Sequence, residues 1–259
     1  PTYFMTLKDN AGLIKQYAFV SVSNYTNVGT GETIDSALRN FRQVRGNAGV
    51  NITTGQTLSK EEGTVLRIAS ETIDNSVTYK LILEEKQGRL SFRCLGETEL
   101  PAGSGPRHMA YHAGNGEYYL VTELGSELFR YTWDSRSEKL ICRQRQSLLT
   151  GAGSKKNLAA DIRVFADGSG LLVSNRGENE IRVFQVDRSS GALALSRRIH
   201  TAGWTRNVRT DRKGRWIFAS NEAYEDNQGS LEVFEADGKR ICKIPLDGAY
   251  AMELFSEEG

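Results

Sequence analysis

A unit of about fifty residues occurs three times in the second part of the chain, and this repeat limits the fold more than any other feature. Each copy has a strand that begins at a turn glycine and ends in a polar residue, followed by a strand that closes on an aspartate. The glycines are Gly116, Gly168 and Gly214, and the aspartates are Asp134, Asp187 and Asp237. Several short strands in a period near 50 residues are typical of a β-propeller blade.

The strands within each copy have the pattern of a half-buried sheet. Residues 181–186 alternate between apolar and polar side chains, and residues 187–191 have the composition of a hairpin turn that leads to an outermost strand. We therefore predict a partial β-propeller with three clear four-stranded blades. A fainter fourth copy at 63–92 indicates part of a fourth blade. An ordinary β-sandwich is the alternative, and three copies in register argue against it.

The N-terminal part differs from the repeats. Short apolar-rich runs indicate strands at 3–7, 13–22, 50–54 and 64–70. Residues 33–44 have the spacing of an amphipathic helix, with arginines off its apolar face. We predict a small α+β module at 1–75, of unknown role, followed by the partial propeller at 76–259. The boundary falls within 60–95, and the fold class as a whole is mainly β.

Composition narrows the classes of function. The chain holds 33 Lys and Arg against 32 Asp and Glu, which argues against a strongly basic surface for nucleic acid. No apolar run of 18 residues predicts a membrane-spanning helix, so no membrane partner is expected. No signal-peptide pattern opens the sequence, and we expect a cytoplasmic location.

Cysteine and histidine give no sign of a metal or a disulfide framework. The three cysteines are scattered without a Cys-x-x-Cys pair, which favours free thiols in a reducing compartment. The three histidines, His108, His112 and His200, lack the spacing of metal ligands. We expect no metal site and no cofactor. His112 belongs to a turn, and we expect it to be exposed to solvent.

Two arginines and one glutamate are the candidates for chemistry. Arg107 stands in Gly-Pro-Arg-His at 105–108, Glu123 follows the next strand, and the second copy brings Arg176 in Ser-Asn-Arg-Gly. A guanidinium binds a carboxylate or phosphate with two parallel hydrogen bonds, which lysine does less well. Near one axis, the three side chains predict a pocket for a small anionic substrate. A buried salt-bridge network between blades is the alternative.

Several other residues are candidates for this site, and the sequence leaves two possible roles open for each. His108 follows Arg107 in a strand, so alternation predicts that it points to the opposite face. It is either a substrate-binding group or a histidine between blades. Asp161 and Arg206 belong to the first strands of the next two blades, and they either reach the substrate or pair with each other. Trp204 either forms a wall of the pocket or packs in the core.

Residues 88–246 resemble the family of seven-bladed propeller lactonases, which includes propeller-type 6-phosphogluconolactonases and carboxymuconate-lactonising enzymes. The matching motifs lie in the family's order, at 100–110, 121–126, 159–162, 174–177, 183–184 and 205–207. The resemblance implies an axial pocket in which Arg107, Glu123 and Arg176 correspond to the family's functional arginines and glutamate. The histidine-rich motif that the family carries one blade upstream has no counterpart here.

The resemblance implies hydrolysis of a sugar-acid lactone such as 6-phosphogluconolactone. Glu123 would activate or orient water, and the arginines would hold the anionic substrate and stabilise the oxyanion. A binding module without catalysis and a lactone-forming cycloisomerase are the alternatives. Seven blades of this length need roughly 350 residues. Three outcomes follow: the N-terminal module covers the open side of the propeller, a second chain in a homo-oligomer completes the ring, or the blades are a remnant that forms no pocket.

Overall fold

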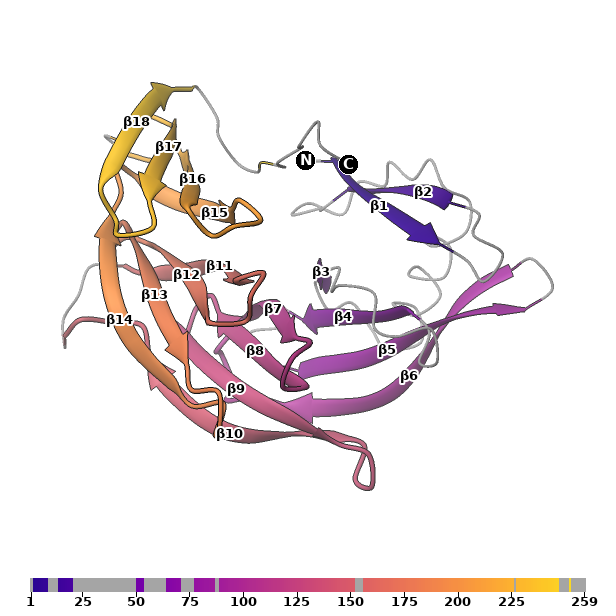
Figure 1. Cartoon of the computed structure of the whole chain (residues 1–259). Coiled ribbons are helices and arrows are strands. Elements are labelled where there is room, and N and C mark those ends of the chain that lie inside the picture. The colour runs from indigo at the N-terminus through magenta and orange to yellow at the C-terminus, as the bar shows by residue number, and fades with distance from the viewer. Residues whose placement is uncertain are drawn as a thin grey trace. The chain divides into compact units, whose positions relative to one another are not determined.

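The structure is a computed structural model of the chain. It describes residues 2–8, 14–20, 50–53, 64–70, 77–86, 89–151, 156–225, 227–246 and 252 (Figure 1). Side-chain surroundings are described from residue 98 onward within these ranges. The predicted helix at 33–44 lies outside the described residues, so the α+β module stays a prediction. The chain divides into two compact units, 1–106 with 134–140, and 107–133 with 141–259.

The first unit contains two sheets. Strands β1 (Thr2–Lys8) and β2 (Ile14–Val20) form an antiparallel pair, as the sequence predicts for 3–7 and 13–22. The other sheet has four strands in sequence order, β3 (Val50–Thr53), β4 (Thr64–Ser70), β5 (Val77–Lys86) and β6 (Arg89–Glu99). Its last three strands are the faint fourth copy. The sheet spans the predicted boundary at residue 75, which itself stays a prediction.

The repeats form three four-stranded antiparallel sheets, most of whose residues belong to the second unit. The first sheet contains β7 (Pro106–His112), β8 (Glu117–Thr122), β9 (Glu127–Asp134) and β10 (Lys139–Ser147). The second contains β11 (Leu158–Val164), β12 (Gly170–Arg176), β13 (Glu180–Val186) and β14 (Leu193–His200). The third contains β15 (Trp204–Thr210), β16 (Trp216–Glu222), β17 (Ser230–Glu235) and β18 (Arg240–Pro245). In each sheet the strands pair in sequence order, as the strands of a propeller blade do.

Apolar clusters join neighbouring sheets in the second unit. On one face of β12, Leu171 and Val173 pack in an apolar cluster with residues of the preceding sheet. These residues include Tyr119, Val121 and Leu128, together with Leu148, which directly follows β10. On the other face, Leu172 packs in a cluster shared with the following sheet, whose contributions are Val208, Ile217, Ala219 and Phe234. All residues of β12 are therefore buried, which explains an unbroken apolar run where a one-sided sheet would alternate.

The repeated glycines and aspartates shape the turns. Gly116, Gly168 and Gly214 all have a positive φ, of 72°, 70° and 64°, which glycine adopts without steric cost. In the hairpin after β13, Asp187 Oδ1 accepts hydrogen bonds from Ser189 and Ser190. These bonds hold the pKa of the Asp187 carboxyl well below its usual range. The repeat therefore conserves turn geometry as well as strand pattern.

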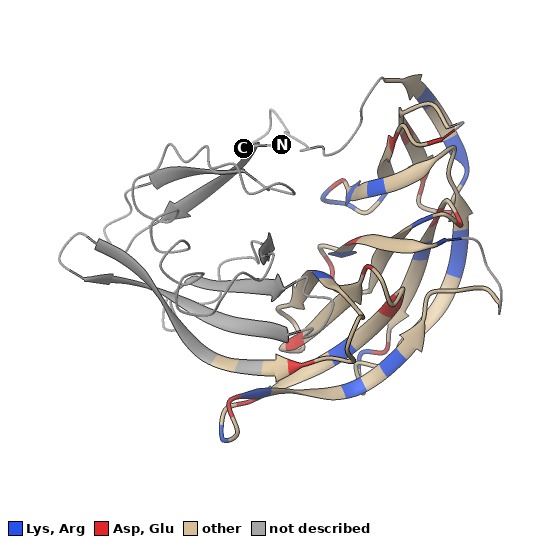
Figure 2. Cartoon of the chain, turned by 180° about the vertical axis from the view of Figure 1, so that it is seen from behind, with Lys and Arg blue, Asp and Glu red and all other residues tan. Residues whose placement is uncertain are grey.

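The outermost strand of each of these sheets carries much of the positive charge (Figure 2). Strands β10, β14 and β18 contain arginine and lysine residues, among them Arg145, Arg198 and Lys243. An edge strand leaves backbone donors and acceptors unpaired, and like charges along it oppose pairing with another chain. The first strands lie at the opposite side of each sheet, where β11 contacts β8 and β15 contacts β11 and β12.

Candidate functional site

The three residues predicted to form an anion site do meet in the structure. Arg107 lies at the start of β7, Glu123 directly follows β8, and Arg176 ends β12. Glu123 Oε2 lies 3.3 Å from Arg107 Nε, and Glu123 Oε1 pairs with Arg176 Nη2. The arginine side chains are 9% and 5% exposed and that of Glu123 is 18% exposed, so one carboxylate bridges two largely buried guanidiniums.

Backbone carbonyls of β11 hold both arginines in place. Arg107 Nη1 donates to Ala160 O, and Arg176 donates to Leu158 O over 3.3 Å and to Ala159 O over 3.4 Å. The Arg107 bond crosses from the first sheet to the second, and the Arg176 bonds lie within the second sheet, so both arginines are fixed before any ligand arrives. Preorganised donors of this kind bind a developing or resident anion without having to reorganise.

Three arginines, Arg107, Arg176 and Arg206, lie near two carboxylates, so the site has a net positive charge. Burial lowers the pKa of Arg176, and the nearby charges of Arg107 and Arg206 lower it further, while Glu123 raises it. A guanidinium remains protonated even so. Arg206 itself pairs with Glu222 across 2.8 Å. The predicted substrate-binding residue Arg206 is therefore close enough to Arg176 to add to this positive charge, but its guanidinium is bound to a different carboxylate.

An aromatic pair lies beside Arg176. The Arg176 guanidinium carbon is 5.9 Å from the ring centroid of Trp204, which is 7% exposed. Tyr224 stacks on Trp204 with ring centroids 3.6 Å apart. Trp204 is thus both packed and next to the site, which joins the two predicted roles. Sequence reasoning missed Tyr224, because it lies in a loop after β16 that has no counterpart in the repeat.

Asp161 has a different position from the one expected of a substrate ligand. Its side chain is fully buried and accepts hydrogen bonds from residues of three consecutive sheets. Oδ1 bonds His108 Nδ1 at 2.8 Å, and Oδ2 bonds Asn207 at 2.7 Å, Arg163 at 3.2 Å and Arg209 at 3.2 Å. This arrangement makes Asp161 a junction between the blades.

His108 connects this junction to the arginine–glutamate site. Alternation along the strand predicts that it points away from Arg107, but this prediction is wrong. His108 Nε2 lies 3.4 Å from Arg107 Nη1, because both side chains reach across to β11. A neutral imidazole satisfies both contacts, since Nδ1–H donates to Asp161 and Nε2 accepts from Arg107. A protonated ring would place an N–H against the guanidinium.

The electrostatic surroundings of His108 also favour the neutral imidazole. Burial and the positive charge of Arg107 lower its pKa to about 4, although Asp161 acts to raise it. Burial alone would raise the pKa of Asp161, but Arg163, His108 and Arg209 hold that pKa well below its usual range. At neutral pH these shifts favour a neutral histidine beside an ionised aspartate.

Acidification should destabilise the fold through His108. An unfolded chain has a histidine pKa near 6.5, above the folded value of about 4, so the unfolded state binds more protons between these values. We expect the free energy of unfolding to fall by on the order of 3 kcal/mol between pH 7 and pH 4 from this group alone. Urea titrations across this range measure the change.

His108→Gln tests the assignment, because glutamine can keep both hydrogen bonds but cannot take up a proton. This variant should lose most of the pH dependence between pH 6.5 and 4. The matched control is His200→Gln, on the exposed side of β14, which should keep the wild-type dependence. An unchanged slope in His108→Gln would show that His108 is not the titrating group.

The expectation that His112 is exposed is also wrong. Its residue is 8% exposed, Nδ1 accepts from the amides of Gly114 and Asn115, and Nε2 lies 2.8 Å from Gly168 O. A Cβ at Gly168 would lie 2.7 Å from the ring. Because Gly168 has no side chain, this turn of the second blade leaves room for His112 of the first blade.

Among the described residues, no group of three or more His, Cys, Asp or Glu is placed to hold a metal ion. Within the same residues, no helix has the length and apolar character needed to cross a membrane.

Consecutive four-stranded antiparallel sheets, with strands paired in sequence order and apolar clusters between neighbouring sheets, are the arrangement of propeller blades. The chain belongs to the lactonase family of seven-bladed β-propellers, whose sequence model matches residues 61–240. A 6-phosphogluconolactonase of Bacillus subtilis is 33% identical over 176 residues, which is 67% of this chain and 48% of the relative. The chain spans about half the length of the curated relatives it matches.

Solved structures show the same fold. A protein from Lactobacillus plantarum matches with a TM-score of 0.65 and 20% identity, over 96% of this chain and 67% of that one. The periplasmic gluconolactonase of Pseudomonas aeruginosa matches with a TM-score of 0.61 and 20% identity, over 96% of this chain and 68% of that one. At this identity the likeness concerns the fold alone.

Proposed function

We propose that the chain hydrolyses the lactone of an anionic sugar acid, with 6-phosphogluconolactone as the first substrate to test. The observation that carries the proposal is one carboxylate held between two buried arginines that backbone carbonyls fix in place. Membership of the lactonase family and the similarity to a 6-phosphogluconolactonase support the reaction class. Because the chain spans about half of such relatives, its own activity is part of the proposal.

The geometry suggests how binding would prepare the reaction. In the free site Glu123 occupies donors of both Arg107 and Arg176. An arriving carboxylate or phosphate would take over some of these donors, since a guanidinium offers five N–H groups in a planar fork. Glu123 would then be free to orient a water and accept its proton.

Water would add to the lactone carbonyl, whose oxygen becomes negative in the tetrahedral intermediate. An arginine stabilises that charge, and the ring C–O bond then breaks. The proton taken up by Glu123 returns to the departing ring oxygen, which becomes the hydroxyl of the open sugar acid. His108 takes no part as a base in this scheme, because both ring nitrogens already have partners.

The test compares two lactones with one purified chain. We expect hydrolysis of 6-phosphogluconolactone above the spontaneous rate, and slower hydrolysis of glucono-δ-lactone, which lacks the phosphate. A pH-stat records the acid released, and light scattering records whether the active species holds one chain or two. If every lactone opens only at the spontaneous rate, the proposed hydrolysis is wrong.

A second function has one specific observation in its favour. Glu123 already pairs with both arginines, as in a structural ion-pair network, and the remaining positive charge suits an anion-binding module without catalysis. Such a module would bind 6-phosphogluconate in a calorimetric titration while every lactone opens at the spontaneous rate. A lactone-forming cycloisomerase would use the same arginines and glutamate, and turnover of a carboxymuconate would identify it.

A further inference from the structure

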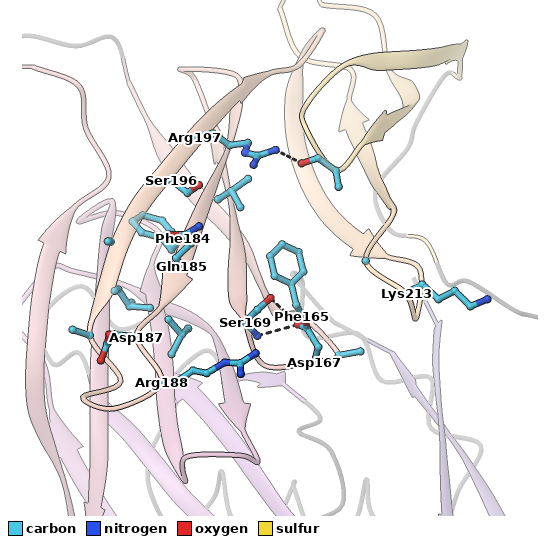
Figure 3. Close-up of a pocket in the computed structure, with 18 of the residues that line it drawn as sticks. Phe165, Asp167, Ser169, Phe184, Gln185, Asp187, Arg188, Ser196, Arg197 and Lys213 are labelled. Carbon is cyan, nitrogen blue, oxygen red and sulfur yellow. Dashed lines mark hydrogen bonds between the residues drawn. The ribbon is translucent and has the colours of Figure 1, made fainter.

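A pocket lies between the second and third sheets, away from the arginine–glutamate site. It has a volume of about 730 Å³, within the usual range for small-molecule sites. Its walls come from the turn before β12, from β13 and β14 with their connecting hairpin, and from the turn between β15 and β16 (Figure 3). All of these residues belong to one compact unit.

The floor of this pocket is apolar. Val183 lines it, is 6% exposed, and belongs to the apolar cluster shared with the third sheet, whereas the lining residues Phe184, Val186 and Leu193 pack in the cluster shared with the first sheet. Phe165 adds an aromatic ring that is only partly buried. The ring rests on Gly170, where a Cβ would lie 3.0 Å from it, so this glycine makes space for the phenylalanine. A flat hydrophobic body has a surface to pack against here.

The rim of the pocket is positive. Its lining includes four cationic side chains, Arg188, Arg197, Arg212 and Lys213, against two carboxylates, Asp167 and Asp187. Arg188, Arg212 and Lys213 are exposed. Arg197 donates a hydrogen bond from Nη1 to Ala236 O. Most of the guanidinium donors at the rim therefore face water.

Both carboxylates accept hydrogen bonds from residues of their own turns. Asp167 Oδ1 accepts from Ser169 N and Ser169 Oγ, and Asp187 Oδ1 accepts from Ser189 and Ser190. In Figure 3 the Asp167–Ser169 bonds lie at the mouth of the turn before β12. An anion at the rim would thus meet four positive charges and two carboxylates whose lone pairs are partly occupied.

The pocket and the arginine–glutamate site lie at opposite ends of one strand. Ser169 of the pocket directly precedes β12, and Arg176 ends it. Seven residues of extended chain span roughly 20 Å. A ligand in one place therefore does not touch the other, and each can be tested separately.

We propose that this pocket is a second ligand site, which binds an organic anion with an aromatic or aliphatic body. The apolar floor would take the body, and the rim arginines and Lys213 would take a phosphate, sulfonate or carboxylate group. This site is additional to the proposed lactone site and does not depend on lactone hydrolysis.

Amide shift mapping by NMR locates binding residue by residue, and 1-naphthyl phosphate is a suitable probe. We expect saturable shifts at 183–197 and 212–214. Neither 1-naphthol nor inorganic phosphate alone should give these shifts with comparable affinity, because each supplies half of the interaction. Shifts confined to the surroundings of Arg107 and Arg176, or equal affinity for inorganic phosphate, would overturn the proposal.

Two variants test the residues. Arg212→Gln/Lys213→Gln removes two rim charges from an exposed turn and should weaken binding about five- to tenfold at low salt. The control Lys239→Gln/Lys243→Gln removes two exposed charges of the same sheet that lie outside the pocket, and it should bind as the wild type does. Ala194→Trp, on an exposed lining position, should fill the pocket and abolish the shifts. Equal binding by the rim variant and its control, or full binding by Ala194→Trp, contradicts the assignment.

Discussion

Replacing Asp161 by alanine should lower the free energy of unfolding by about 3–5 kcal/mol, the usual result when one partner of a buried ion pair is removed. The carboxylate is fully buried and joins His108, Arg163, Arg209 and Asn207. Without it, positive charge from two sheets is left close together with no acceptor. Urea denaturation at pH 7 measures the loss.

Two further variants separate charge from packing. Asp161→Asn keeps the shape and one acceptor oxygen but brings an NH₂ group toward donors, so we expect a loss of similar sign and smaller size. As a control, Asp237→Ala removes an exposed aspartate from the hairpin between β17 and β18. It should change the free energy of unfolding by about 0.5 kcal/mol or less. If Asp161→Ala is no worse than this control, Asp161 is not the junction that the hydrogen bonds describe.

The repeat made most of the fold of the second unit predictable. A glycine with positive φ and an aspartate that accepts from its own turn recur in each copy, and these local features need no knowledge of distant contacts. The convergence of Arg107, Glu123 and Arg176 also followed from the repeat. Equivalent positions in adjacent blades come to equivalent places in space, so motifs about 50 residues apart become neighbours.

The errors concern contacts between blades. Alternation treats a strand as isolated, but Arg107 and His108 both extend to β11, and neither residue is oriented by its own sheet. His112 is buried because Gly168 leaves room for it 56 residues further along the chain. Tyr224 belongs to a loop unique to one copy. No pattern within a single repeat carries this information.

Removing both arginines of the proposed lactone site should reduce kcat/KM for 6-phosphogluconolactone by about three orders of magnitude, and each single alanine variant by about one to two. The loss follows from the bidentate charge-assisted bonds that a guanidinium forms with an anion, and which alanine cannot form. Arg107→Lys and Arg176→Lys should fall between wild type and alanine. Arg136→Ala, an exposed arginine of the β9–β10 hairpin, serves as the control and should retain wild-type kinetics.

Glu123→Gln distinguishes a catalytic carboxylate from a structural one. If Glu123 competes with the substrate for the two arginines and then serves as the base, the glutamine variant should lose about a hundredfold or more in kcat. It should also bind the product 6-phosphogluconate at least as tightly, because the guanidinium donors are no longer held by a charged rival. A purely structural ion pair predicts the opposite, namely a lower melting temperature with weaker binding, since the arginines would lose the group that holds them. Calorimetric titration of the product, together with a thermal melt of the same sample, tells the two apart.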